Sequence, residues 1–305
     1  MRVLVIGQAA FGEAVFKRLI ADGLDVAGVS APEPTAGSRP DPLWAIAEAA
    51  GVALVPTALL KKPEGISRWA SLNGDLCVMA FVTEIIPSAI LEVPPLGTIQ
   101  YHPSLLPAHR GSSAMNWAII NGDSETGLTI FWPDSGIDTG PVLLTKTCPI
   151  AASDTVSSIY FNQLFPMGVD AIAESIALVQ SSSAARIEQD HLASTYEPAC
   201  EAAHAEIRWH EPALRISALI RGCNPQPGAW TTYQGAKLGI FDIELLGRGA
   251  AGLPGRVLEI SETAIDVRLN GDVLRIGRVQ PAGGKKMSAG SWAAEVGLKK
   301  GYRFR

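Results

Sequence analysis

Short apolar runs alternate with amphipathic segments at the start of the chain. Arg2 to Ile6, ended by Gly7, is typical of a strand buried on both faces. From Phe11 to Leu24 apolar residues recur at helical spacing, and Asp25 to Ser30 is again typical of a strand. The pattern therefore predicts a β-α-β unit at the amino terminus.

The same alternation continues over the next hundred residues. Residues 31–40 are rich in proline, glycine and serine and predict a surface loop, after which Asp41-Pro42 begins a helix that ends at Gly51. The remaining predicted strands of this half are Val52–Val55, Asp75–Phe81, Gly97–Tyr101 and Thr126–Trp132. Strands alternating with helices predict an α/β fold with an open, mainly parallel, Rossmann-like sheet and helices on both faces.

The pattern changes in the second half of the chain. A helical stretch runs from Asp154 to about Gln180, interrupted at Pro166, and a further helix spans Pro212 to Arg221. Short alternating runs separated by glycines then predict a small β-barrel (OB-like) module: Thr231–Gln234, Lys237–Leu245, Gly255–Ile260, Ala264–Leu269 and Asp272–Val279. We therefore expect a catalytic domain over 1–185, a linker over 186–205 and a β-barrel accessory domain over 206–305.

Composition narrows the class of protein. A chain of 305 residues with 47% hydrophobic and 18% charged residues has enough apolar material for two packed domains. The net charge of −5 gives no global reason to bind nucleic acid, and four cysteines without CxxC spacing do not indicate a zinc ribbon or a disulfide framework. The first residues form a strand rather than a signal peptide, and no apolar run is long enough for a membrane span. We expect a cytoplasmic protein without a metal, and leave its oligomeric state open.

The turn between the first strand and helix, Gly7-Gln8-Ala9-Ala10-Phe11-Gly12, invites comparison with dinucleotide-binding turns. It lacks the middle glycine of G-x-G-x-x-G, and no acidic residue closes the second strand where a ribose hydroxyl would lie. It also lacks the Lys-Ser/Thr of a P-loop. A tight structural turn is the better interpretation, and a nicotinamide oxidoreductase is disfavoured.

The residues best able to do chemistry lie between Gln100 and Gly140. Gln100 and His102 are two positions apart on one predicted strand, so both project from the same face. If Asp138 meets them from the neighbouring strand end, the amide and imidazole would face a developing oxyanion, while the carboxylate orients the imidazole or takes a proton. We expect the loops after His102, Phe81 and Trp132 all to lie at carboxyl ends of strands and so to converge at one edge of the sheet, where open α/β sheets bind ligands. No serine or cysteine lies in a nucleophile motif, so an acyl group would pass directly to the acceptor.

These motifs resemble a known family. Tyr101-His102-Pro103-Ser104-Leu105-Leu106-Pro107 with Arg110-Gly111, followed by Gly136-Ile137-Asp138-Thr139-Gly140, resembles the 10-formyltetrahydrofolate-dependent formyltransferases. Within that family the chain most resembles the hydrolase domain of 10-formyltetrahydrofolate dehydrogenase, including Asp41-Pro42-Leu43 and Leu164-Phe165-Pro166. The carboxyl-terminal half resembles the family's accessory barrel.

The resemblance implies particular roles. His102 and Asp138 occupy the catalytic positions, with Gln100 beside them, and 10-formyltetrahydrofolate is the one-carbon donor. The folate would be held by Phe81, Val82, Thr83, Glu84, Ile85 and Ile86, by Leu105, Leu106 and Pro107, and by Pro133, Asp134, Ser135, Gly136 and Ile137. Arg110 would pair with a carboxylate of the substrate or of the protein, and a structural salt bridge is the expected use.

One position departs from the family pattern. Family transferases usually carry asparagine where this chain has Gln100, whereas the dehydrogenase's domain is apolar there. Glutamine keeps the amide donor but adds a methylene, and an error of about 1 Å can cost roughly 100-fold in rate. We expect either a compensating change of the pocket or a different acceptor or one-carbon unit.

The leading hypothesis is therefore a one-carbon enzyme that passes the formyl group to a small-molecule amine or to water through a tetrahedral intermediate. Methionyl-tRNA formyltransferase is the first alternative, and the acidic balance of the chain disfavours a tRNA partner. Hydroxymethyl transfer from a methylene-folate and a non-catalytic folate-binding protein are further alternatives. Because the sequence ends at Arg305, we expect this chain alone not to oxidise the formyl group to carbon dioxide.

Overall fold

The computed structural model describes residues 1–247, 249 and 251–305. The chain forms two compact units that interleave along the sequence. The first unit comprises Met1–Ser112, Gly127–Cys148 and Phe161–Glu197, and the second comprises Ser113–Thr126, Pro149–Tyr160 and Pro198–Arg305. The domain boundaries predicted at residues 185 and 206 stay a prediction. No helix in the described part of the chain is long and apolar enough to cross a membrane.

The first unit contains a seven-stranded sheet in the order β3-β2-β1-β4-β5-β6-β7. Its strands are β1 (Arg2–Gly7), β2 (Asp25–Ala31), β3 (Leu54–Pro56), β4 (Leu76–Ala80), β5 (Thr98–His102), β6 (Glu125–Phe131) and β7 (Val142–Pro149). From β3 to β5 all neighbours are parallel, whereas β6 runs antiparallel to β5. The predicted mainly parallel α/β sheet is confirmed, with β7 as a strand that the sequence pattern did not predict.

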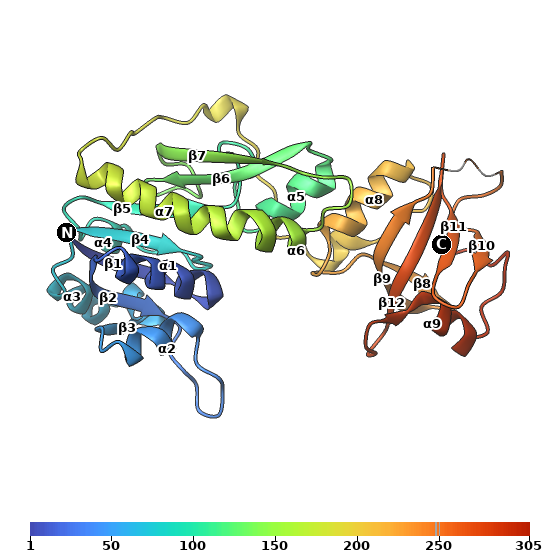
Figure 1. Ribbon diagram of the computed structural model, residues 1–305, viewed down its shortest axis with the longest axis horizontal. Helices are drawn as coiled ribbons and strands as arrows, with labels where there is room; N and C mark the ends of the chain where they lie inside the picture. Colours follow the sequence, from blue (N-terminus) through green and yellow to red (C-terminus); the bar gives the residue numbers. More distant parts are fainter. Residues whose placement is uncertain (248, 250) are drawn as a thin grey trace. The chain divides into compact units, whose positions relative to one another are not determined.

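Helices cover both faces of this sheet (Figure 1). On one side α1 contacts both α2 and α7, while on the other α3 contacts α4 and the 3-10 helix η1. The core on the α3 side includes Leu4, Ile6, Cys77 and Met79, alternate residues of β1 and β4. The helices of this unit are α1 (Ala9–Ala21), α2 (Pro42–Ala49), α3 (Pro63–Ser71), α4 (Ser88–Leu91) and α7 (Phe165–Gln180), with 3-10 turns η1 (Thr57–Lys61) and η3 (His191–Ala193).

The first strand-to-helix turn is held by packing and by a side chain. A Cβ on Gly7 would lie 2.3 Å from the carbonyl oxygen of Ala80, so only glycine allows β1 and β4 to approach there. The Asp41 carboxylate caps α2 by accepting from the Leu43 N–H (2.9 Å) and also accepts from the Ala9 N–H (2.8 Å). Gly7 and Asp41 therefore have structural uses, as the tight-turn interpretation expects.

The second unit is built around an antiparallel sheet in the order β10-β11-β12-β9-β8, with β13 paired to β12. The predicted small β-module is confirmed as a curled antiparallel half-barrel. Its strands are β8 (Trp230–Tyr233), β9 (Ala236–Leu245), β10 (Val257–Ile260), β11 (Ile265–Arg268), β12 (Val273–Pro281) and β13 (Met287–Ser288). Its helices are α5 (Ala114–Asn121), α6 (Val156–Ile159), α8 (Ala213–Gly222), the 3-10 turn η4 (Ala202–Ala205) and α9 (Ala289–Glu295), which packs on β11 and β12.

Two details differ from the sequence pattern. The helical stretch expected from Asp154 is not one helix broken at Pro166, because a π-helix over Tyr160–Leu164 separates α6 from α7. Pro166 lies in the first turn of α7, where its missing N–H costs nothing. The helix α9 within the β-rich region was not predicted, since its glycine-containing sequence has no long apolar stripe.

Candidate active site

The strand order reverses between β1 and β4, which is the position where open α/β sheets bind ligands. A small pocket lies there, at the carboxyl ends of these strands. It is lined by Ile6, Gly7, Gln8, Thr57, Phe81, Val82, Thr83 and Glu84. Phe81 adopts a left-handed conformation (φ +61°), a strained state for a bulky side chain, and strain of this kind gathers at functional sites.

The residues of the loop after β4 lie in different environments. Gln8 donates a hydrogen bond to the Thr83 hydroxyl (3.2 Å), and Glu84 pairs with Lys61 (2.6 Å). Ile85 is 76% exposed, whereas Ile86 is buried in the core on the α3 side. The structure thus gathers Phe81 to Glu84 at one pocket, and Ile86 faces the core instead.

His102, the last residue of β5, is 5% exposed, and its ring orientation is fixed by its neighbours. Its Nε2 lies 2.9 Å from the carbonyl oxygen of His109. Because a carbonyl oxygen can only accept, we infer that Nε2 carries a hydrogen. Nδ1 therefore remains the nitrogen able to exchange a proton, and it lies 3.6 Å from Oδ2 of Asp138.

Asp138 is also buried and is held in a left-handed conformation (φ +55°). Its Oδ2 accepts a hydrogen bond from the Gly111 N–H (2.8 Å) and faces the His102 ring at the same time. The distance of 3.6 Å to Nδ1 is too long for a hydrogen bond. The two side chains form a close, mostly buried imidazole–carboxylate pair, an arrangement suited to moving a proton.

The route by which Asp138 reaches His102 differs from our expectation. Because β6 is antiparallel to β5, with Gln100 opposite Phe131 and His102 opposite Thr129, the carboxyl ends of these strands point to opposite edges. The prediction that both loops leave the sheet at the same edge is wrong. The two ends of the loop after β6 are joined by a hydrogen bond from the Trp132 N–H to the Pro141 carbonyl (2.9 Å). Asp138 lies within this loop, and its carboxylate lies close to the His102 ring.

Gln100 projects from the same face of β5 as His102 and is half-buried. Its side-chain amide makes no hydrogen bond with any residue in the described part of the chain, so it remains available to a ligand. An amide donor two positions from the imidazole is compatible with the predicted oxyanion contact.

The loop that follows His102 is held by backbone and hydroxyl contacts. Leu106 is 8% exposed and its N–H donates to the Thr129 hydroxyl (3.1 Å). The Pro107 carbonyl accepts from the Thr195 N–H (3.2 Å), and the Leu105 side chain packs beside Gly127. Of these three predicted folate contacts, Leu106 and Pro107 thus also have structural roles.

The loop that carries Asp138 is organised by Asp134. Its Oδ1 accepts from the Gly136 N–H (2.9 Å) and from the Thr139 hydroxyl (2.5 Å). Pro133 is half-buried, Ser135 is exposed and Ile137 is 49% exposed, so part of this predicted folate-binding loop faces solvent.

Sequence reasoning missed His109, near the candidate site, and the residues of the predicted linker that hold it. His109, in a left-handed conformation (φ +55°), is held by its N–H bond to the Thr195 hydroxyl (2.8 Å) and by an Nδ1 contact with Glu197 (3.0 Å). This conformation directs the His109 carbonyl at His102. The polar run Gln189-Asp190-His191 is the sequence signal that could have indicated a role for this segment beyond joining the two predicted domains.

Arg110 is buried, and the salt bridge expected for it is replaced by contacts with neutral groups. Its Nη2 lies 2.7 Å from Oε1 of Gln189 and 3.0 Å from Nδ1 of His191. Since a guanidinium only donates, Nδ1 of His191 must carry a lone pair. Among described residues these are the partners of the Arg110 side chain.

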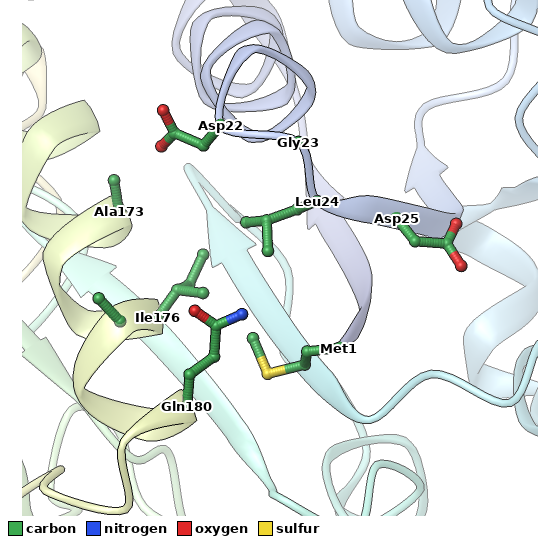
Figure 2. A pocket seen from close by; sticks show the side chains of 9 residues that line it. Met1, Asp22, Gly23, Leu24, Asp25, Ala173, Ile176 and Gln180 are labelled. Atoms are coloured by element: carbon green, nitrogen blue, oxygen red, sulfur yellow. The ribbon is translucent and has the colours of Figure 1, made fainter.

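A larger pocket of about 380 Å³ lies elsewhere in the first unit, between the turn from α1 to β2 and helix α7 (Figure 2). Its lining includes Met1, Leu24, Asp25 and Gln180, at the amino-terminal ends of β1 and β2. None of the predicted site residues lines it. No group of three or more histidine, cysteine, aspartate or glutamate side chains arranged to hold a metal ion occurs among the described residues.

Known proteins resemble this chain along most of its length. Residues 1–165 match the family Formyl transferase, and residues 200–297 match Formyl transferase, C-terminal domain. The chain is 39% identical to cytosolic 10-formyltetrahydrofolate dehydrogenase of Xenopus tropicalis, covering 85% of this chain and 29% of that protein. It is 36% identical to methionyl-tRNA formyltransferase of Trichlorobacter lovleyi, covering 84% of this chain and 80% of that protein. The chain thus spans less than a third of the length of the dehydrogenases it matches.

Solved structures share the fold. HypX from Aquifex aeolicus in complex with tetrahydrofolic acid aligns with a TM-score of 0.70 at 18% identity, covering 97% of this chain and 47% of that one. The sugar 3N-formyl transferase WlaRD aligns with a TM-score of 0.68 at 18% identity, covering 91% and 97%. The resemblance stated from the motifs is confirmed, and the chain belongs to the formyl transferase family.

Proposed function

We propose that this chain takes the formyl group of 10-formyltetrahydrofolate and passes it to an amine or to water. The observation that carries this proposal is the buried pair of His102 Nδ1 and Asp138 Oδ2, 3.6 Å apart, within the family's central motif. The family match and the tetrahydrofolate complex of the similarly folded HypX support the choice of donor.

The chemistry follows from what each side chain can do. When an amine or water adds to the formyl carbon, the carbonyl oxygen gains negative charge, and the unpaired Gln100 amide is suited to donate to it. The nucleophile must lose a proton and N10 of the folate must gain one as the C–N bond breaks. His102 Nδ1 and Asp138 together supply a site that can take and return that proton.

The pocket at the reversal point between β1 and β4 supports a folate-binding role for the loop after β4. It is lined by Phe81, Val82 and Thr83, and it lies at the edge of the sheet where His102 ends β5. We propose that the pteridine is held by this loop and by the loop over residues 133–137, with Leu105 to Pro107 beside it.

The first experiment measures tetrahydrofolate release from 10-formyltetrahydrofolate, with and without candidate amines. We expect release by the wild-type protein and a loss of at least about 100-fold in kcat for His102→Ala and for Asp138→Asn. No release under any condition would refute catalysis and favour a non-catalytic folate-binding protein. Full turnover by His102→Ala would refute the site. Release of tetrahydrofolate from methylene-tetrahydrofolate instead would favour hydroxymethyl transfer.

A second candidate acceptor is methionyl-tRNA. It is favoured by the match with methionyl-tRNA formyltransferase, because that relative is covered over 80% of its length and the dehydrogenase over only 29%. The net charge of −5 favours a small acceptor instead. Formylation of charged initiator tRNA, measured against hydrolysis in the same reaction, decides between them. The acceptor and the cytoplasmic location stay predictions.

A further inference from the structure

Gln189 lies outside every helix and strand of the first unit, yet it is only 6% exposed. Its amide nitrogen donates to two backbone carbonyls of the loop that carries the candidate catalytic aspartate: those of Asp138 (2.9 Å) and Gly140 (2.7 Å). Its amide oxygen accepts from Nη2 (2.7 Å) and Nε (3.3 Å) of Arg110. All of the hydrogen-bonding capacity of the amide group is therefore directed at residues around the site.

These contacts close a ring around Asp138. Arg110 and Gly111 are connected to the loop that carries Asp138 in two ways. The Gly111 N–H donates directly to Oδ2 of Asp138, and the Gln189 amide accepts from Arg110 while it donates to the Asp138 carbonyl. The backbone of Asp138 is thus held on one side while its carboxylate is held on the other. The Gln189 amide forms no hydrogen bond with His102, whose ring nitrogens face the His109 carbonyl and Asp138.

The backbone of Asp138 needs such support. Its φ of +55° lies in the left-handed region, which costs a non-glycine residue roughly 1 kcal/mol or more and persists only where surrounding contacts impose it. Without the bond to its carbonyl, the peptide can rotate, and rotation at this residue moves the carboxylate relative to Nδ1 of His102. A shift of about 1 Å in a reacting group can cost on the order of 100-fold in rate.

We propose that Gln189 is a positioning residue, which fixes the Asp138 carboxylate against His102 through the backbone of residues 138–140. The expected effect of Gln189 on kcat rests on the proposed function, whereas its effect on the position of the Asp138 carboxylate rests on the geometry alone. Glutamine is suited to this position because one planar group must donate to two carbonyls and accept from a guanidinium at once. An ionised glutamate can accept from Arg110 but has no hydrogen to give to the carbonyls.

The kinetic test compares Gln189→Ala and Gln189→Glu with wild type. We expect kcat to fall on the order of 10- to 100-fold while KM changes less than about 3-fold, since the residue acts on the geometry of reaction rather than on binding. Protonation of the introduced glutamate restores a donor, so the ratio of Gln189→Glu to wild-type kcat should rise as pH falls. Arg110, Asp138 and His191 are the charged or titratable groups around that side chain.

Asn116 provides the matched control. Its amide nitrogen also donates to two backbone carbonyls, those of Gly222 (2.8 Å) and Gln226 (3.1 Å), but in the second unit. Asn116→Ala and Asn116→Asp should lower the free energy of unfolding without a comparable loss of kcat and without the pH-dependent recovery. Equal losses of kcat in both pairs of variants would refute a positioning role.

A spectroscopic measurement separates this proposal from the proposed function. The chain has only five histidines, so the ring nitrogen signals of His102 can be assigned by comparison with His102→Asn. At constant pH, Gln189→Ala should shift these signals in the same direction as Asp138→Asn does, whatever the enzyme's activity. Unchanged His102 signals in a folded Gln189→Ala protein would overturn the proposal. A wild type without turnover but with the expected shift would overturn the proposed function and leave the positioning intact.

Discussion

Replacement of Gly140 by alanine should impair catalysis more than folding. A Cβ at this position would lie 1.8 Å from the carbonyl oxygen of Trp132 and 3.3 Å from the backbone nitrogen of Asp134. Real Cβ contacts are not closer than 3.0 Å, so the backbone must move by about 1.2 Å. Because the obstacle is backbone, no side-chain rotation can relieve it.

The movement falls on the loop that carries the carboxylate. Gly140 is two residues from Asp138, and its carbonyl accepts the shorter of the two Gln189 bonds, at 2.7 Å. A displacement near 1 Å at a catalytic group corresponds to roughly 100-fold in rate. Overpacking of this kind also costs about 1–3 kcal/mol of stability.

The assay measures kcat and KM for tetrahydrofolate release, together with urea unfolding. Gly65→Ala is the control. Its Cβ would lie 1.9 Å from the Leu59 carbonyl oxygen, a clash similar to that at Gly140, but Gly65 lies on α3 and not on the loop that carries Asp138. Both variants should lose similar stability, and only Gly140→Ala should lose about 100-fold in kcat. If kcat of Gly140→Ala stays within about 3-fold of wild type, the link between loop geometry and rate is wrong.

Three further predictions concern the scaffold. Burial raises the pKa of the Cys77 thiol from 9.0 to about 12, so the folded state should lose stability as pH rises from about 9 to about 12. Alkylation at pH 8 should spare Cys77 until the chain unfolds, and rapid labelling of the native protein, detected by mass spectrometry, would contradict this. Thr155→Ala removes the capping box with Ser158 and should cost about 0.5–2 kcal/mol in urea unfolding, whereas Thr155→Ser should cost less. Trp209→Phe loses a buried bond to the Thr231 hydroxyl (2.9 Å) as well as part of a buried ring, and its cost should be about 1 kcal/mol smaller in a Thr231→Val background if the bond contributes.

The sequence predicted most helices and strands well, because the patterns that indicate them involve residues that are close together in the chain. The apolar runs of β1 and β4 are buried on both faces, and the N-cap at Asp41 begins α2 where the Asp-Pro signal indicated. The alternating runs of the second half became β8 to β12 within one or two residues. The pattern missed β7 and α9, whose burial is decided by neighbours rather than by their own periodicity.

The candidate site was predictable only in part. His102 and Gln100 share a face of β5 because of the two-residue period, which the sequence shows directly. The direction of β6 was not predictable, since an antiparallel pairing leaves the apolar pattern unchanged. Arg110 was expected to bind a carboxylate, but burial beside Gln189 and His191 gave it neutral partners instead.

The sequence by itself determined most of the strands, the family and the identity of the chemical groups, because periodicity and motifs are properties of neighbouring residues. Only the tertiary structure decided how those groups are held. The His102 ring contacts the carbonyl of His109, and the Asp138 carbonyl accepts a hydrogen bond from Gln189, which is 51 positions away along the chain. Hydrogen bonds between distant segments form where the packed elements bring donors and acceptors together, and no local pattern records which partners will meet.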